Sequence, residues 1–241
     1  MATALITGAA SLIGEGIARA LARDGWDLAL TDINSQGAEE VAKRLAANSR
    51  VEVRELDVTD HGRVKQVVGE TARAFGAVDA LVNCAGGLRG LGLTRKPVAE
   101  MPPEDWRRII DTNLKGVLNA VHCTLPVMKD QGSGAIVSIA ASRGLRGAAG
   151  AAHYSAAKAG IILFTQTMVL ECAGYGVRIN TIAPGNADAR WKGPDDGATV
   201  APLGRPTSED DVGGAVRWLL SPEASHVTGA CIDVSGGTTL H

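Results

Sequence analysis

A tyrosine and a lysine stand four positions apart in the second half of the chain, as Tyr154 and Lys158. Residues four apart on a helix share a face, so both side chains can point into one cleft. A phenol has a reference pKa of about 10, and a nearby cation favours its ionised form. The pair therefore predicts proton exchange between Tyr154 and a substrate oxygen, with Lys158 lowering the pKa of the phenol.

A glycine-containing turn near the N-terminus has the composition of a phosphate site. Residues 7–14 read Thr-Gly-Ala-Ala-Ser-Leu-Ile-Gly and join an apolar run to a helical pattern. Free N–H groups and the positive end of the helix dipole converge at such a turn, which suits a pyrophosphate. Asp32 closes the next apolar run, and a carboxylate there accepts hydrogen bonds from ribose hydroxyls and repels a 2′-phosphate. Together they predict NAD in preference to NADP; an ordinary tight turn and a helix-capping aspartate are the alternatives.

Short apolar runs that alternate with helical patterns must position these residues. The runs typical of strands are 4–6, 28–30, 51–53, 80–82, 135–137, 177–179 and 231–234. The helical patterns cover 13–23, 105–129 with Pro126 ending or kinking it, and 160–173, which continues a helix from near His153. This alternation predicts an α/β fold: a Rossmann-like three-layer αβα sandwich with a doubly wound parallel sheet of about seven strands.

The chain reads as a single dinucleotide-binding and catalytic domain over residues 1–241. The segment near 186–203 is rich in Gly, Pro, Asp and Ala, and we expect a flexible substrate lid there. A formal net charge of −2 without a basic run argues against nucleic acid and membrane partners. The four cysteines lie far apart in a chain too large to need disulfides, so we expect a reducing, cytoplasmic location. The five histidines lack metal-ligand spacing, so we predict no metal. The expected partner is a small-molecule substrate.

Six motifs occur in the order and at the spacings of one known family. They are the glycine turn, Asp57-Val58, Asn83-Cys84-Ala85-Gly86, Asn113, Tyr154-x-x-x-Lys158 and Pro184-Gly185. Along its whole length the chain resembles the short-chain dehydrogenase/reductase family. The resemblance implies the strand order 3-2-1-4-5-6-7, hydride transfer between NAD and a secondary alcohol or carbonyl, and a homotetramer or homodimer.

The resemblance also implies roles for individual residues. Tyr154 is the expected acid or base, Lys158 also holds the nicotinamide ribose, and Asn113 anchors a water relay to the lysine. Asp57 and Val58 meet the adenine, while Pro184, Gly185 and the residues after them flank the nicotinamide. The expected cofactor-binding residues are Gly8, Ser11, Leu12, Ile13, Gly14, Asp32, Ile33, Asp57, Val58, Asn83, Ala85, Gly86, Tyr154, Lys158, Pro184, Gly185 and Ala187.

The fourth catalytic position departs from the family pattern. The family has a serine 13 positions before the tyrosine, and this chain has Ala141 there. Ser142 is the neighbour, but it replaces the missing hydroxyl only if the backbone turns there, because adjacent side chains of a strand point to opposite faces. Losing one oxyanion-type donor costs about 10²- to 10³-fold in rate. Two hypotheses follow: an ordinary dehydrogenase that uses Ser142 or another donor, or a cofactor-binding, catalytically weak protein.

Three further features leave alternatives open. Leu12 stands at the family's middle glycine and could crowd the phosphates, and Ala189 replaces a threonine that contacts the carboxamide. A cationic cluster near the expected substrate mouth would recognise an acidic substrate or would simply be solvated; it comprises Arg143, Arg146, Arg190, Trp191 and Lys192. An NADPH-dependent 3-oxoacyl-[acyl-carrier-protein] reductase is the alternative enzyme, and Asp32 disfavours it.

Overall fold

Seven parallel strands form one sheet in the computed structural model, which describes residues 1–45, 49–186 and 201–239. The order is β3-β2-β1-β4-β5-β6-β7, so the predicted fold class and the implied strand order are confirmed. Residues 187–200 of the expected lid lie outside the described residues. The strands are β1 (Thr3–Thr7), β2 (Asp27–Asp32), β3 (Val51–Glu55), β4 (Ala80–Asn83), β5 (Gly134–Ile139), β6 (Val177–Pro184) and β7 (Cys231–Val234).

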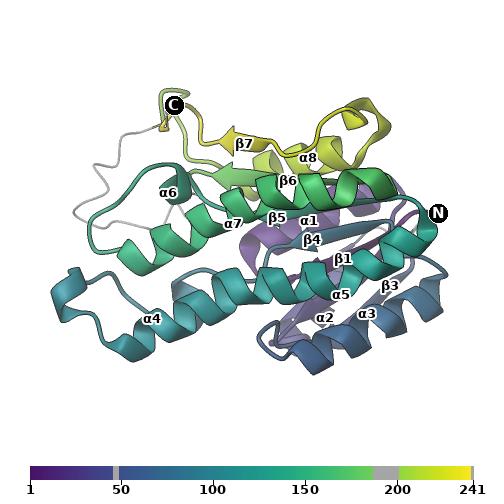
Figure 1. Cartoon of the computed structure of the whole chain (residues 1–241), viewed down its shortest axis with the longest axis horizontal. Coiled ribbons are helices and arrows are strands. Elements are labelled where there is room, and N and C mark those ends of the chain that lie inside the picture. Colours follow the sequence, from purple (N-terminus) through teal and green to yellow (C-terminus); the bar gives the residue numbers. More distant parts are fainter. Residues whose placement is uncertain (46–48, 187–200, 240–241) are drawn as a thin grey trace.

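Helices cover both faces of the sheet, because successive side chains along a strand point to opposite sides. Ala4 and Ile6 of β1 belong to one apolar core, and Leu5 between them belongs to the other. The first core is closed by α1 (Leu12–Arg23), α2 (Ser35–Arg44) and α8 (Glu209–Leu220). The second is closed by α3 (His61–Phe75), α5 (Gly116–Gln131) and α7 (Ala152–Cys172). In Figure 1, α5 and α7 lie in front of the sheet and α1 lies behind it.

The helix expected over 105–129 is divided into two. Helix α4 (Pro103–Ile110) and helix α5 are joined by a π-helical turn, Asp111–Lys115. A π turn inserts an extra residue into the helical repeat, often at a functional position. Pro126 lies inside α5, which continues to Gln131, so of the two expected effects of this proline, ending or kinking the helix, the first does not occur. Periodicity detected the apolar faces of both helices and missed the insertion between them.

The remaining described helices are short, apart from α7. The helix expected from near His153 to Ala173 is confirmed as α7. The short elements are α6 (Ser142–Leu145) and the 3₁₀ turns η1 (Arg89–Leu91), η2 (Val98–Glu100), η4 (Ala173–Tyr175) and η5 (Pro222–Ala224). Helix α6 follows β5 directly and sets the backbone direction at Ser142.

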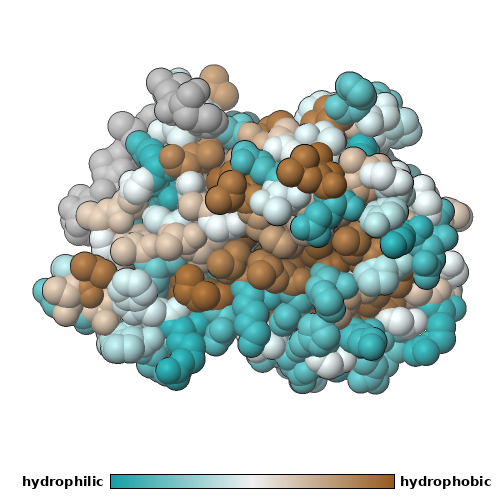
Figure 2. All heavy atoms as spheres, viewed as in Figure 1, coloured by the Kyte–Doolittle hydropathy of each residue, from teal (hydrophilic) through white to brown (hydrophobic). Residues whose placement is uncertain are grey.

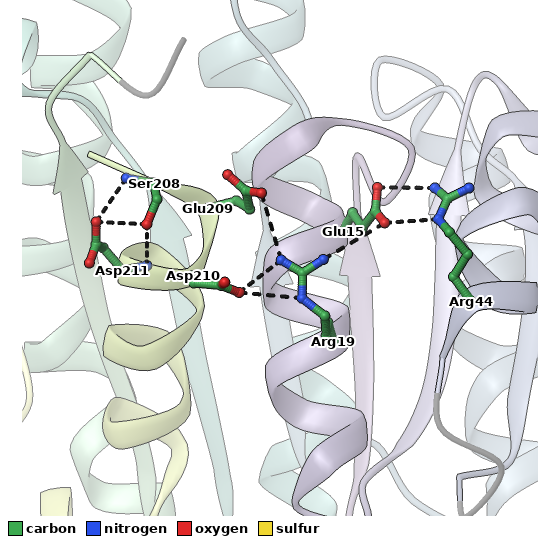
Figure 3. Close-up of polar contacts among 7 residues, drawn as sticks. All are labelled: Glu15, Arg19, Arg44, Ser208, Glu209, Asp210 and Asp211. Atoms are coloured by element: carbon green, nitrogen blue, oxygen red, sulfur yellow. Dashed lines mark hydrogen bonds and ion pairs between the residues drawn. The ribbon is translucent and has the colours of Figure 1, made fainter. Parts of the chain in front are cut away.

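Helix α1 is held against α8 by glycine contact and ion pairs. A Cβ on Gly16 would lie 2.6 Å from the Glu209 Cβ, so the two helices meet backbone to backbone. Arg19 of α1 pairs with Asp210 of α8 at 2.8 Å, and Glu15 pairs with Arg44 of α2 at 2.9 Å (Figure 3). Exposed pairs of this kind are each worth at most about 1 kcal/mol. These contacts place the first two turns of α1 between α2 and α8.

Candidate active site

A pocket of about 520 Å³ lies at the carboxyl edge of the central strands. Eight of the expected cofactor residues line it: Gly8, Ser11, Asp32, Ile33, Asp57, Val58, Ala85 and Gly86. The expected residues that do not line it are Leu12, Ile13, Gly14, Asn83, Tyr154, Lys158, Pro184 and Gly185, and Ala187 lies outside the described residues. The structure thus brings together the residues expected at the adenosine and pyrophosphate end.

The glycine turn leaves no room for side chains at two positions. Gly8 has φ +71°, and a Cβ there would lie 2.6 Å from the Ala85 Cα. A Cβ on Gly14 would lie 2.2 Å from the Gly8 oxygen. Ser11 caps α1, because its hydroxyl accepts the Gly14 N–H at 3.1 Å. Leu12 is 45% exposed and is not a lining residue, so it leaves the pocket open.

Asp32 lies at the end of β2 and is bound to the glycine turn. Its two carboxylate oxygens accept the Ala10 N–H at 3.0 Å and the Asn34 N–H at 2.9 Å. The residue that caps α2 is Asn34, whose side chain accepts the Gly37 N–H, so the helix-capping alternative for Asp32 is wrong. Each carboxylate oxygen has a further lone pair, and Asp32 lines the pocket. A glycine cradle beside an acceptor-only side chain fits a dinucleotide that carries free ribose hydroxyls.

The end of β4 is built from buried polar contacts. The Thr7 hydroxyl accepts the Cys84 and Ala85 N–H groups, both at 3.2 Å, which joins β4 to β1. Asn83 is 2% exposed, and its amide donates to the Ser138 hydroxyl at 3.0 Å. Ser138 is itself fully buried in the sheet, where its hydroxyl oxygen accepts this hydrogen bond. Asn83 therefore supports the floor of the pocket, and burial keeps the Ser138 hydroxyl from replacing the missing catalytic serine.

Asn113 sits in the π turn and holds the segment that follows β4. Its side-chain oxygen accepts the Gly87 N–H at 2.7 Å, and its amide donates to the Ile109 oxygen at 3.2 Å. The residue is completely buried, and a Cβ on Gly86 would lie 2.5 Å from its side-chain oxygen. The geometry gives Asn113 a positioning contact that the sequence did not predict. Its expected part in a water relay stays a prediction.

Lys158 lies on α7 one turn after Tyr154, with its amine inside the protein. The side chain is 4% exposed, and its Nζ donates to the Ile139 oxygen at 2.8 Å. The same Nζ lies 5.7 Å from the centre of the Tyr154 ring. The predicted common face is therefore present, and it points to the end of β5. Burial lowers the pKa of Lys158 to about 8.

The electrostatics of Tyr154 differ from the expectation. Burial raises the pKa of the phenol to about 12, and the nearby Arg143 and Arg95 offset this only in part. In the chain by itself, removal from water outweighs the attraction of neighbouring cations for the phenolate. Tyr154 is consequently a neutral phenol at neutral pH. That state suits donation of a proton to a carbonyl oxygen.

The backbone turns at Ser142, which is the condition under which this residue could replace the missing serine. Ala141 is buried and extended, with φ −166° and ψ 156°, and the backbone turns into α6 at Ser142. Helix α6 packs directly on α7, because a Cβ on Gly144 would lie 2.8 Å from the Lys158 carbonyl carbon. The half-buried Ser142 therefore belongs to the same strand end that Lys158 contacts.

The expected nicotinamide end is completed by β6. Pro184 is buried, and Gly185 donates its N–H to the Val234 oxygen at 3.0 Å. A Cβ on Gly185 would lie 2.8 Å from the Thr207 hydroxyl, so the backbone is tightly enclosed there. Ala189, Arg190, Trp191 and Lys192 lie outside the described residues. Within residues 1–45, 49–186 and 201–239, no group of three or more His, Cys, Asp or Glu side chains could hold a metal.

Several lining residues were not predicted. Half of them are neighbours of predicted residues, where position alone would have suggested them: Ala10, Asn34, Leu56, Thr59 and Cys84. The others come from later in the chain: Gly90, Leu91, Arg108, Asp111 and Thr112. Nothing in their local pattern indicates a pocket, because only the packing of α4 and η1 brings them to it.

Comparisons with known proteins agree with this geometry. A family model described as Enoyl-(Acyl carrier protein) reductase matches residues 8–239. A 3-oxoacyl-[acyl-carrier-protein] reductase of Thermotoga maritima is 35% identical, with 98% of this chain and 97% of the relative covered. A cis-4-hydroxycyclohexanecarboxylate dehydrogenase of Sinomonas cyclohexanicum is 38% identical, with 98% and 96% covered.

Solved structures resemble the chain over nearly its whole length. A levodione reductase superposes with a TM-score of 0.90 at 29% identity, with 98% of this chain and 96% of that chain covered. A xylitol dehydrogenase with bound NAD⁺ superposes with a TM-score of 0.89 at 27% identity, with 98% of each chain covered.

Proposed function

Because this chain belongs to the short-chain dehydrogenase/reductase family, we propose that it transfers a hydride between NAD and a secondary alcohol or carbonyl compound. Membership makes the chain an oxidoreductase that acts on CH–OH groups with a nicotinamide cofactor. The choice of NAD and the residues that do the chemistry are the proposal. The observation that carries it is the Tyr154 and Lys158 pair on one face of α7, at the end of β5.

NAD is the proposed cofactor because of Asp32. The carboxylate lines the pocket and is held in place by two backbone N–H groups. A 2′-phosphate brought beside it would meet like charge, whereas ribose hydroxyls would find an acceptor. The NAD⁺-bound xylitol dehydrogenase among the structural relatives is consistent with this choice. Gly8, Gly14 and Ser11 would hold the pyrophosphate at the N-terminus of α1.

The protein's own groups hold and move the proton. When bound, the nicotinamide accepts or returns the hydride. Tyr154, neutral at pH 7, donates its proton to the substrate oxygen during reduction and is left as a phenolate. In the oxidation direction that phenolate form accepts the proton of the alcohol. Lys158 gives the phenol a cationic neighbour and contributes to the ribose site. Ser142 supplies the hydroxyl that orients the substrate oxygen. Asn113 positions the backbone of Gly86 and Gly87, and Gly86 lines the cofactor pocket.

The test is a panel of alcohols and ketones assayed with NAD(H) and NADP(H). The panel includes 4-hydroxycyclohexanecarboxylate, xylitol, a cyclic diketone and a 3-oxoacyl thioester, after the named relatives. Replacing Tyr154 by Phe should lower kcat by about 10²- to 10⁴-fold while NADH still binds. Tyr175→Phe is the matched control, because Tyr175 is the other tyrosine and lies in η4 after the far end of α7. Full activity of Tyr154→Phe would overturn the mechanism.

A second candidate is NADPH-dependent reduction of a 3-oxoacyl-[acyl-carrier-protein]. The Thermotoga maritima relative favours it, and Asp32 disfavours it. Fluorescence titration separates the two candidates, because tighter binding of NADPH than of NADH would contradict the role of Asp32. The remaining alternative, a catalytically weak cofactor-binding protein, predicts dinucleotide binding without turnover on the whole panel.

A second copy of the chain is the proposed partner. Helix α7 with η4, Ala152–Tyr175, is long and apolar enough to cross a membrane by length and composition alone. A core helix has the same properties, and α7 buries Ile161 and Met168 against the sheet. Its outer side is also apolar, with Leu163 65% and Leu170 88% exposed. Figure 2 shows apolar side chains gathered across the front of the molecule, which Figure 1 shows to be the side of α5 and α7.

Light scattering tests this partner directly. A homodimer or homotetramer is expected, and Leu170→Glu should shift it toward the monomer. Val98→Glu is the control, because Val98 is exposed on η2, outside α5 and α7. A monomeric native chain would refute the proposal.

We also propose a cytoplasmic location, with which the four unpaired cysteines are consistent.

A further inference from the structure

Residues 86–92, after β4, form one wall of the cofactor pocket, and none of their described side chains belongs to either apolar core. Gly90 and Leu91 line the pocket, and the 3₁₀ turn η1 contains both. The Leu91 and Leu93 N–H groups both donate to the Leu88 oxygen, at 3.2 and 3.1 Å. Glycines occur at 86, 87, 90 and 92, so the chain has wide conformational freedom there. Such a wall needs an external contact to keep its shape.

Two residues of one continuous helical stretch supply that contact. Asn113 of the π turn binds the beginning of the segment, through the Gly87 N–H at 2.7 Å. Arg108 of α4 binds its end, because its Nη2 donates to the Leu91 oxygen at 2.7 Å. Arg108 and Leu91 both line the pocket. The segment 87–91 is therefore fastened at both ends to the stretch 103–115.

We propose that Arg108 is a cofactor-positioning residue, which holds the turn Arg89–Leu91 in the shape that encloses the bound dinucleotide. This inference rests on the proposed function, since it takes the pocket to be the cofactor site. Arg108 is exposed rather than part of the core, so its replacement by alanine leaves no cavity in the core. Without it, cofactor binding would have to order a glycine-rich turn, and that ordering weakens affinity.

The adjacent Arg107 provides a matched control. It is also exposed and also on α4, but its guanidinium pairs with Glu104 at 2.8 Å and does not line the pocket. Arg108→Ala should raise the Kd for NADH and the KM for the cofactor about tenfold, the value of one hydrogen bond to a charged group. The kcat at saturating cofactor and the melting temperature should stay at wild-type values. Arg107→Ala should change none of these, and Arg108→Lys should restore part of the affinity.

Amide hydrogen exchange of the cofactor-free chain gives a second readout. In Arg108→Ala, the Leu91 and Leu93 amides should exchange faster, while amides of β1 should not change. Cofactor affinity equal to wild type, an equal loss in Arg107→Ala, or unchanged exchange at Leu91 would each overturn the inference. Failure of the wild-type chain to bind either dinucleotide would instead remove the proposed function. The exchange rates would still decide whether Arg108 holds the turn.

Discussion

The buried amine of Lys158 should make the protein less stable at neutral pH than it is at high pH. Burial lowers the pKa of Lys158 from 10.5 to about 8. This lowering of the pKa corresponds to about 3 kcal/mol of lost stability while the amine is charged. Below pH 8 the amine is protonated in both the folded and the unfolded chain, so the folded chain carries the full penalty for burying the charge. Between pH 8 and 10.5 the cost disappears, and the free energy of unfolding rises with pH from this residue alone.

Replacing Lys158 by Met tests that magnitude. Methionine has similar length without charge, so the variant avoids the destabilisation, but it loses the hydrogen bond from the charged amine to the Ile139 oxygen, worth about 1.5 kcal/mol. The variant should therefore be about 1–2 kcal/mol more stable than the wild type at pH 7 and should lose activity. A stabilised, inactive variant is the expected outcome where a buried charge serves function at the expense of stability.

The assay is urea denaturation of both proteins at several pH values from 7 to 10. The difference in free energy of unfolding should shrink steadily as the pH rises through 8, because only the wild type changes protonation at this site. Lys115→Met is the control: Lys115 is exposed, and its replacement should shift stability by no more than about 0.5 kcal/mol at any pH. A difference between Lys158→Met and wild type that is constant with pH would refute the reasoning.

Three other substitutions test the pocket and the packing that supports it. Asp32→Ala should raise the Kd for NADH about tenfold and leave that for NADPH unchanged or lower, as measured by fluorescence titration. Ser142→Ala should lower kcat by about 10²-fold because its hydroxyl orients the substrate, whereas no loss in this variant together with a large gain in Ala141→Ser would favour the catalytically weak alternative. Gly16→Ala should lower the free energy of unfolding by about 1–3 kcal/mol, because its Cβ would lie 2.6 Å from Glu209. The control Gly69→Ala, in α3 with no atom within 4 Å of its Cβ, should stabilise by about 0.5–1 kcal/mol in the same urea denaturation.

The sequence by itself determined the fold and the identity of the chemical groups. Alternating apolar runs and helical patterns specify a parallel sheet covered on both faces, because each strand must bury both of its sides. The four-residue spacing of Tyr154 and Lys158 specifies a common helix face. Asp32 follows a strand and a glycine turn, which places a carboxylate at the edge of the sheet. These are local rules, so one sequence is enough to apply them.

Tertiary structure decided how those groups behave. Ser142 is a candidate for the role of the missing serine because the backbone turns into α6 at that residue. The pKa of Tyr154 rises instead of falling because the surrounding protein removes the phenol from water. Arg108 reaches the pocket because the π turn and η1 bring α4 beside the end of β4. Desolvation and contacts between distant segments depend on everything that surrounds a residue, and no local pattern in the chain contains that information.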